Sequence, residues 1–138
     1  MFICYILTAL SFIGILINGL QGFFQFNIYN ANHIAFAFIS TILYMFTQTL
    51  IMFYFIGAGK KIKETILKHN LKKDIYKEVI DIKKELFSPL TLNMLFIGTV
   101  FVLGGGVHTA AVNKYWHSGL FVISILHYLK VIIIQHRS

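Results

Sequence analysis

Two stretches of the chain carry the same three polar residues at the same spacing. The first set is His33, Ser40 and Tyr44, at positions 0, +7 and +11 of an apolar run, and a later run repeats it as His117, Ser124 and Tyr128. On a helix with 3.6 residues per turn, these positions lie within about 40° of one another. Each set therefore predicts a narrow polar stripe along one face of a helix.

The histidines are the members of these stripes that can hold a cofactor. Two imidazoles at equal depth on facing helices can supply both axial ligands of a b-type haem. With His108, which ends another apolar run, they can supply three imidazoles to a copper or zinc ion. His33 and His117 also stand where membrane helices are expected to begin, and a histidine there is often an interfacial or hydrogen-bonded group with no cofactor. Both interpretations stay open, whereas the serines and tyrosines are expected to form hydrogen bonds between helices.

The composition indicates that the stripes lie in a membrane. Of 138 residues, 57% are hydrophobic and 12% are charged, while soluble domains carry about 25% charged residues. Four apolar runs reach the length of about 20 residues that a membrane-spanning helix needs, namely Phe2–Gly22, His33–Gly57, Leu90–Val107 and His117–Ile134. The first run lacks the basic region and cleavage site of a secretory signal, so we expect it to be retained. The chain is predicted to be an all-α integral membrane four-helix bundle.

Both polar stripes should face the interior of this bundle, because a polar group left in hydrocarbon costs several kcal/mol. The first and third spans carry small or amide residues instead, at Gly14, Asn18, Gly22, Gly98 and Gly106. Such residues let helices approach closely or leave room for a flat ligand.

The two stripes belong to an internal repeat. Shifting the chain by 84 positions aligns residues 12–48 with residues 96–132 and gives eight identities in 37 positions, including Gly22 with Gly106 and both histidines. An even number of spans separates the copies, so both hairpins have the same orientation in the membrane. The sequence predicts a pseudo-twofold arrangement of two helical hairpins.

The charges indicate how the chain is oriented. All five acidic residues and nine of the twelve basic residues lie between Lys60 and Leu86. By the positive-inside rule this segment and both termini are predicted to be cytoplasmic, in a plasma (inner) membrane. Lys60, Lys61 and Lys63 are expected to contact lipid head groups.

The same distribution excludes several functions. No carboxylate lies within a span, which excludes aspartic-protease and glycosidase chemistry there. The spans also contain no pair of a nucleophile and a base, so a membrane enzyme is disfavoured. Nucleic-acid binding is disfavoured because the basic residues alternate with acidic ones and no recognition motif accompanies them.

The charged segment has a helical pattern of its own. Its apolar residues recur every three to five positions. The second span is predicted to continue to about Lys68, with Asn70 as a left-handed cap and Leu71 folding back on it. A separate amphipathic helix, Lys72–Phe87, is then expected on the membrane surface or against a partner, before Ser88-Pro89 starts the third span. The chain thus divides into a first hairpin at 1–57, a basic connector at 58–89 and a second hairpin at 90–138.

One motif suggests a family. The stretch from Tyr54 to Glu64, Tyr-Phe-Ile-Gly-Ala-Gly-Lys-Lys-Ile-Lys-Glu, resembles a signature of small, uncharacterised bacterial four-span membrane proteins. This chain has Ala58 where that pattern has threonine. The resemblance implies the four-span topology and a bacterial origin, and it carries no activity with it.

Two functions follow as expectations. The first is a non-catalytic integral subunit of a larger membrane complex, electron-transferring, with a haem or metal held by His33 and His117 near the outer face. The alternative is a cofactor-free structural or transport component that docks partner proteins or lipids. The partners expected in either case are membrane lipids and other subunits or further copies of the chain.

Overall fold

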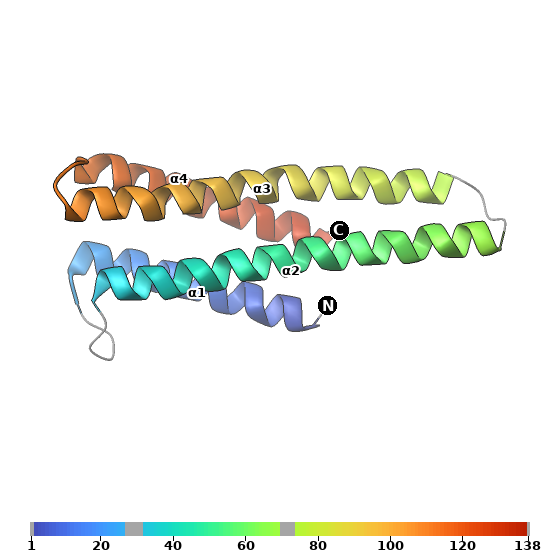
Figure 1. Ribbon diagram of the computed structural model, residues 1–138, viewed down its shortest axis with the longest axis horizontal. Coiled ribbons are helices and arrows are strands. Elements are labelled where there is room, and N and C mark those ends of the chain that lie inside the picture. The colour runs from blue at the N-terminus through green and yellow to red at the C-terminus, as the bar shows by residue number, and fades with distance from the viewer. Residues whose placement is uncertain (1, 27–31, 70–73, 138) are drawn as a thin grey trace.

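The chain forms four helices and, in the parts that the structure describes, no strand. The structure is a computed structural model that describes residues 2–26, 32–69 and 74–137. The helices are α1 (Phe2–Phe24), α2 (His33–Lys68), α3 (Asp74–His108) and α4 (Lys114–Arg137) (Figure 1). Each contains a stretch long and apolar enough to cross a membrane. The predicted all-α membrane bundle of four spans is confirmed.

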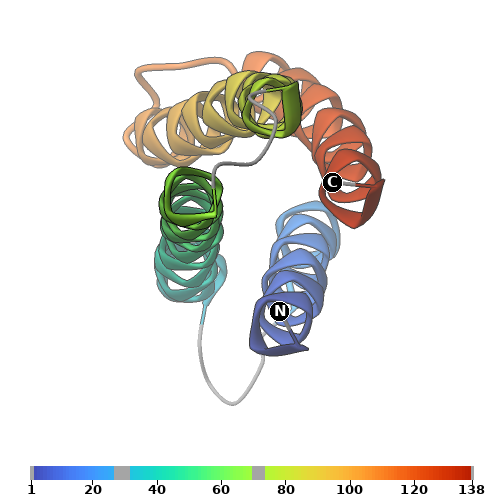
Figure 2. The ribbon, with the colours of Figure 1, turned by 90° about the vertical axis from the view of Figure 1, so that its right-hand side faces the viewer.

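The helices form a ring in chain order. α1 packs on α2, α2 on α3 and α3 on α4, while α1 and α4 touch least (Figure 2). α2 and α4 therefore stand diagonally across the bundle. Both chain ends lie at one end of the four spans and the α3–α4 link at the other (Figure 1). Side chains on α2 and α4 that point inward approach the same central axis.

Large apolar side chains cover the outside of the bundle. Exposed examples occur on every helix, among them Leu10, Phe46, Leu95 and Leu126. Serine, threonine, asparagine, glutamine and tyrosine side chains are instead buried inside, beside an apolar core. This distribution suits a protein surrounded by lipid, in which polar groups gather where other polar groups can satisfy them.

Local capping fixes where α2 and α4 begin. The side chain of Asn32 accepts a hydrogen bond from the backbone N–H of Ala35 at 2.9 Å, so His33 is the first residue of α2. The side chain of Asn113 accepts one from Tyr115 at 3.0 Å, just before α4. Asparagine is a favoured N-cap because its side-chain oxygen satisfies a free N–H of the first turn.

The charged segment differs from its prediction. α2 continues to Lys68, as expected, but no separate surface helix follows, because α3 runs without a break from Asp74 to His108 and contains Pro89. The expected cap at Asn70 and Leu71 lies outside the described residues. α2 and α3 both extend beyond α1 and α4 as a pair of helices (Figure 1).

Packing explains why these extensions stay together. Gly59 of α2 lies beneath the side chains of Val79 and Lys83 of α3. The ammonium of Lys63 sits 5.7 Å from the centre of the Tyr76 ring. Of the apolar positions that suggested a surface helix, Ile66 is buried and Val79 half-buried, whereas Ile62 and Ile75 are exposed.

Pro89 does not start the third span because the residues on both sides of it are anchored. Proline removes one helical hydrogen bond and tends to bend or break a helix. Leu86 and Leu90 flank it, and both side chains are completely buried in the core. Their burial holds the two segments in one helix, α3.

The repeat is present, with a shift in one half. Buried positions on α2 recur on α4 at the predicted spacing of 84, as with Ser40 and Ser124. Buried positions on α1 recur on α3 at a spacing of 82 instead. The pairs are Cys4/Leu86, Thr8/Leu90, Ser11/Asn93 and Ile15/Ile97. All of these residues are buried except Cys4, which is partly exposed. The ungapped alignment is therefore correct for α2 and α4 but two residues out of register for α1 and α3. Ile97 and Ser124 are 27 positions apart in the chain, whereas Ile15 and Ser40 are 25 apart, so the second hairpin is two residues longer between these buried positions.

The pairing of the extensions can be tested at Ile66, which is 7% exposed. Replacing it with aspartate should separate the extensions, because an unpaired carboxylate is costly to bury. We expect the amides of residues 74–85 to lose protection in hydrogen-exchange measurements. Leu67→Asp is the matched control, since Leu67 is 72% exposed. Equal behaviour of the two variants would contradict the packing described.

Candidate functional site

The structure brings His33 and His117 together inside the bundle. Their ring centroids are 6.5 Å apart and the ring planes are inclined at 75°. His33 is the first residue of α2, and His117 is the fourth residue of α4. The two imidazoles meet across the diagonal of the bundle, at the end opposite the chain termini, and both residues are half-buried.

A backbone carbonyl of α3 orients the imidazole of His117. Nδ1 of His117 lies 3.1 Å from the carbonyl oxygen of Val100. A carbonyl can only accept, so Nδ1 donates and Nε2 keeps a free lone pair. The ring of His33 lies close to the backbone of Asn18, the position on α1 that corresponds to Val100, but its Nδ1 has no hydrogen-bond partner among the described residues. Both imidazoles thus lie beside equivalent positions of the two hairpins, but among the described residues the Nδ1 hydrogen bond belongs to His117 alone.

A glycine makes room for each ring. A Cβ atom on Gly22 would lie 2.9 Å from Cε1 of His33, and one on Gly104 would lie 3.1 Å from Cε1 of His117. Both distances are shorter than an ordinary contact between carbon atoms. The glycine opposite His117 is Gly104, not the predicted Gly106, which packs against Val112. This follows from the two-residue shift between α1 and α3.

A cavity of about 180 Å³ adjoins the two imidazoles, with walls from all four helices. Apart from the histidines its polar residues are Asn18 and Thr41, and Ile15 and Ile97 contribute from α1 and α3. The side-chain oxygen of Asn18 and Nδ1 of His33 are buried and have no hydrogen-bond partner among the described residues. Ligand sites commonly combine apolar walls with a few such polar groups.

A layer of tyrosines lies further along the same two helices. Tyr44 and Tyr128 are completely buried, with ring centroids 4.9 Å apart. The Tyr44 hydroxyl donates to the side chain of Asn93, which donates in turn to the Ser124 carbonyl at 2.9 Å. The Ser40 hydroxyl donates to the Gly14 carbonyl at 3.4 Å. Both predicted stripes face inward.

Tyr128 belongs to a second set of hydrogen bonds. Its hydroxyl pairs with the Ser11 hydroxyl at 2.8 Å and accepts from the Gln48 side chain at 3.1 Å. Gln48 accepts from the Gln135 side chain at 2.9 Å. The hydroxyl of Ser124, unlike those of the tyrosines, bonds within its own helix, to Leu120. The two sets together join all four helices by side-chain hydrogen bonds.

Four members of this network are not foreseen in the sequence analysis: Ser11, Gln48, Asn93 and Gln135. The signal that could have identified them is polarity alone, since an amide or hydroxyl inside an apolar span normally faces a partner. The repeat did not reveal Ser11 and Asn93 as equivalents because their spacing is 82 and their residue types differ.

The three-histidine metal site is not assembled. His108 ends α3 as an exposed residue. Throughout the described ranges, no three His, Cys, Asp or Glu side chains lie close enough together to hold a metal ion. The structure therefore unites two of the three predicted ligands.

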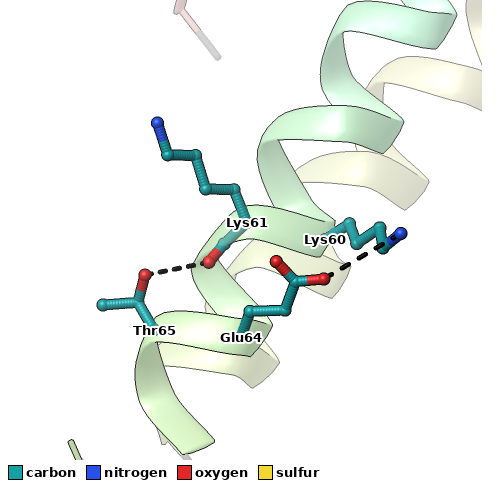
Figure 3. A network of polar contacts seen from close by, with 4 residues as sticks. All are labelled: Lys60, Lys61, Glu64 and Thr65. Atoms are coloured by element: carbon teal, nitrogen blue, oxygen red, sulfur yellow. Dashed lines mark hydrogen bonds and ion pairs between the residues drawn. The ribbon is translucent and has the colours of Figure 1, made fainter. Parts of the chain in front are cut away.

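The lysines predicted to contact lipid lie on the α2 extension. Lys60, Lys61 and Lys63 are all exposed. Lys60 forms an ion pair with Glu64 at 3.9 Å, and the Thr65 hydroxyl donates to the Lys61 carbonyl at 2.9 Å (Figure 3). An exposed pair one helical turn apart contributes little to stability, so these side chains remain available to other partners.

Comparison of the chain with protein-family models, curated proteins and solved structures gives no match.

The buried network can be tested at Tyr44. Tyr44→Phe leaves the Asn93 side chain without its donor, and we expect the free energy of unfolding to fall by about 0.5–2 kcal/mol. Unfolding of the micelle-solubilised protein by sodium dodecyl sulfate, followed by circular dichroism, measures this change. Tyr54→Phe alters an exposed tyrosine of the same helix and should have no effect. A Tyr44→Phe protein as stable as the wild type would show that the network does not stabilise the bundle.

Proposed function

We propose that this protein is a membrane-embedded b-type haem protein that transfers electrons as a subunit of a larger membrane complex. His33 and His117 would be the two axial ligands. The observation that carries the proposal is the pairing of these imidazoles across the bundle at 6.5 Å.

This separation agrees with ligation of one metal ion from both sides. A metal–nitrogen bond is about 2.0–2.1 Å, and a ring centre lies roughly 1 Å beyond its nitrogen, which places two opposed imidazole centres about 6 Å apart. The Val100 carbonyl supports the same role, because a ligating histidine usually donates its other ring N–H to a backbone carbonyl or a carboxylate.

The number of ligands favours haem over a bare metal ion. Zinc and copper(II) need three or four ligands from the protein, and the described residues gather two. Two imidazoles are sufficient where a macrocycle supplies the other four nitrogen ligands. The cavity lies against the same two rings, so the residues fit a flat cofactor that brings most of its own ligands.

The chain's own residues would bind, orient and shield the group. Haem iron supplies reversible one-electron chemistry when bound. Because His33 and His117 would both hold the haem, they would leave no place on the iron for a substrate, which would favour electron transfer. The cavity is smaller than a porphyrin, so the rings of Phe101 and Phe121, which line it, have to turn for the macrocycle to enter. Burial among apolar walls would keep water from the iron.

The orientation in the membrane is part of the proposal. The excess of lysine in the α2 and α3 extensions supports a cytoplasmic location for them, in the plasma membrane. Both chain termini would then be cytoplasmic, and the histidine pair would lie near the outer face. The Tyr54–Glu64 motif supports kinship with bacterial four-span proteins.

Absorption spectroscopy tests the haem. The protein purified from membranes of haem-replete cells should show a Soret band and bind one haem per chain. His33→Ala and His117→Ala should each lose the band, because one imidazole holds haem far more weakly than two. His108→Ala and His136→Ala are controls at exposed positions and should keep it. A colourless wild-type protein that contains no iron would leave the cofactor-free docking component as the function.

Labelling of single cysteines tests the orientation. In a Cys4→Ala background, cysteines placed at Phe26 and Ala111 should react with a membrane-impermeant maleimide on intact cells. A cysteine placed at Lys61 should react only after the membrane is permeabilised. The reverse pattern would contradict the proposed topology.

A further inference from the structure

Lys130 is a cation on the lipid-facing side of a membrane span. On α4 the buried residues are Ser124, Tyr128, Val131 and Gln135. Lys130 is exposed and lies about 200° around the helix from Tyr128. Its neighbours one turn away on the same side, Leu126 and Ile133, are 62% and 67% exposed. This side of α4 is apolar except for Lys130.

The repeat places Lys130 within the apolar part of the bundle, 13 residues after His117 and four residues before Ile134, the end of the fourth apolar run. Its counterpart on α2, 84 positions earlier, is Phe46, which is 57% exposed and also faces outward. Phe46 lies 13 residues after His33 and 11 residues before Gly57, so it is close to the centre of the apolar run His33–Gly57. A charged residue at that depth is costly, and in membrane proteins it generally has a partner.

His127 adds an unsatisfied polar group beside Lys130. Nδ1 of His127 is buried and has no hydrogen-bond partner in the described parts of the chain. Its ring packs edge-on against Phe96 of α3, with centroids 5.4 Å apart. Lys130 is close enough to interact with it electrostatically. Two potential donors therefore lie one helical turn apart with no acceptor.

Snorkelling does not readily satisfy Lys130. The nearer membrane surface is at the C-terminal end of α4, where Arg137 lies about 10 Å further along the axis. Side chains on a helix point back towards its N-terminus, which here is the direction away from that surface. A partner within the membrane is the more favourable arrangement.

The chain cannot supply that partner itself. All its acidic residues lie between Lys60 and Leu86, and within the described residues Lys130 forms no ion pair, since Lys60 and Glu64 form the only one there. A second copy of the chain has the same spans and brings no carboxylate either. We propose that the lipid-facing side of α4 around Lys130 docks a transmembrane helix of a different protein, which places an aspartate or glutamate against the Lys130 ammonium.

The proposal does not depend on the histidine pair. Lys130 lies about 20 Å along α4 from His117 and on its lipid-facing side. Haem binding and docking can therefore succeed or fail separately. The partner is defined by its chemistry, an apolar span that carries one carboxylate at the depth of Lys130.

Site-specific photocrosslinking in membranes of the native host tests the docking. Benzoylphenylalanine at Ile133 should form one product with a second protein, and mass spectrometry should locate the joined peptide in an apolar span that contains aspartate or glutamate. Lys130→Met should reduce the product about tenfold or more, the change that 1.4 kcal/mol produces, while Lys130→Arg should retain it. The same crosslinker at Phe46 is the control and should give no such product.

Reversal of the charges completes the test. Lys130→Asp should abolish the product, and exchange of the partner's carboxylate for lysine should restore it. The variants should elute from size-exclusion chromatography as the wild type does, because residue 130 is exposed. The proposal is overturned if the product is a dimer of this chain, if only lipid is labelled, if the joined span has no carboxylate, or if Lys130→Met leaves the yield unchanged.

Discussion

The absence of water inside a bilayer is the constraint that organises this protein. A polar side chain there is stable only where another polar group meets it, and in this chain such groups meet along the central axis. Tyr44 from α2 and Tyr128 from α4 pack together, Asn93 ties the first to α3 and Ser11 ties the second to α1. Once this layer forms, the rotation of α2 and α4 about their axes is fixed. His33 and His117, eleven residues away on the same faces, are then directed towards each other.

The layer that stabilises the bundle and the site that would hold a cofactor are separate. Ile15 and Ile97, equivalent residues of α1 and α3, line the cavity between the histidines and the tyrosine layer. The cavity therefore lies beside the tyrosine layer and is not part of its hydrogen-bond network. Gly22 and Gly104 allow close approach of the rings at this end only.

Periodicity and repetition were sufficient to predict the spans, the inward direction of both polar stripes and the meeting of His33 with His117. Periodicity and repetition were insufficient to predict features that depend on contacts between segments far apart in the sequence. The register of α3 against α1 depends on two additional residues between the equivalent buried positions of the second hairpin, which an ungapped comparison cannot detect. The continuity of α3 through Pro89 depends on burial of Leu86 and Leu90, and the pairing of the extensions depends on Gly59 beneath Lys83. The partners of the tyrosines, Ser11 and Asn93, are likewise set by tertiary packing.

The central claim is that His33 and His117 bind the same iron from opposite sides. An electron paramagnetic resonance spectrum of the oxidised protein, purified from membranes, reports the axial ligands of that iron directly. The account predicts a low-spin ferric signal of the kind given by two imidazole ligands. A high-spin signal from iron with a single axial ligand, or a protein without iron, would contradict it.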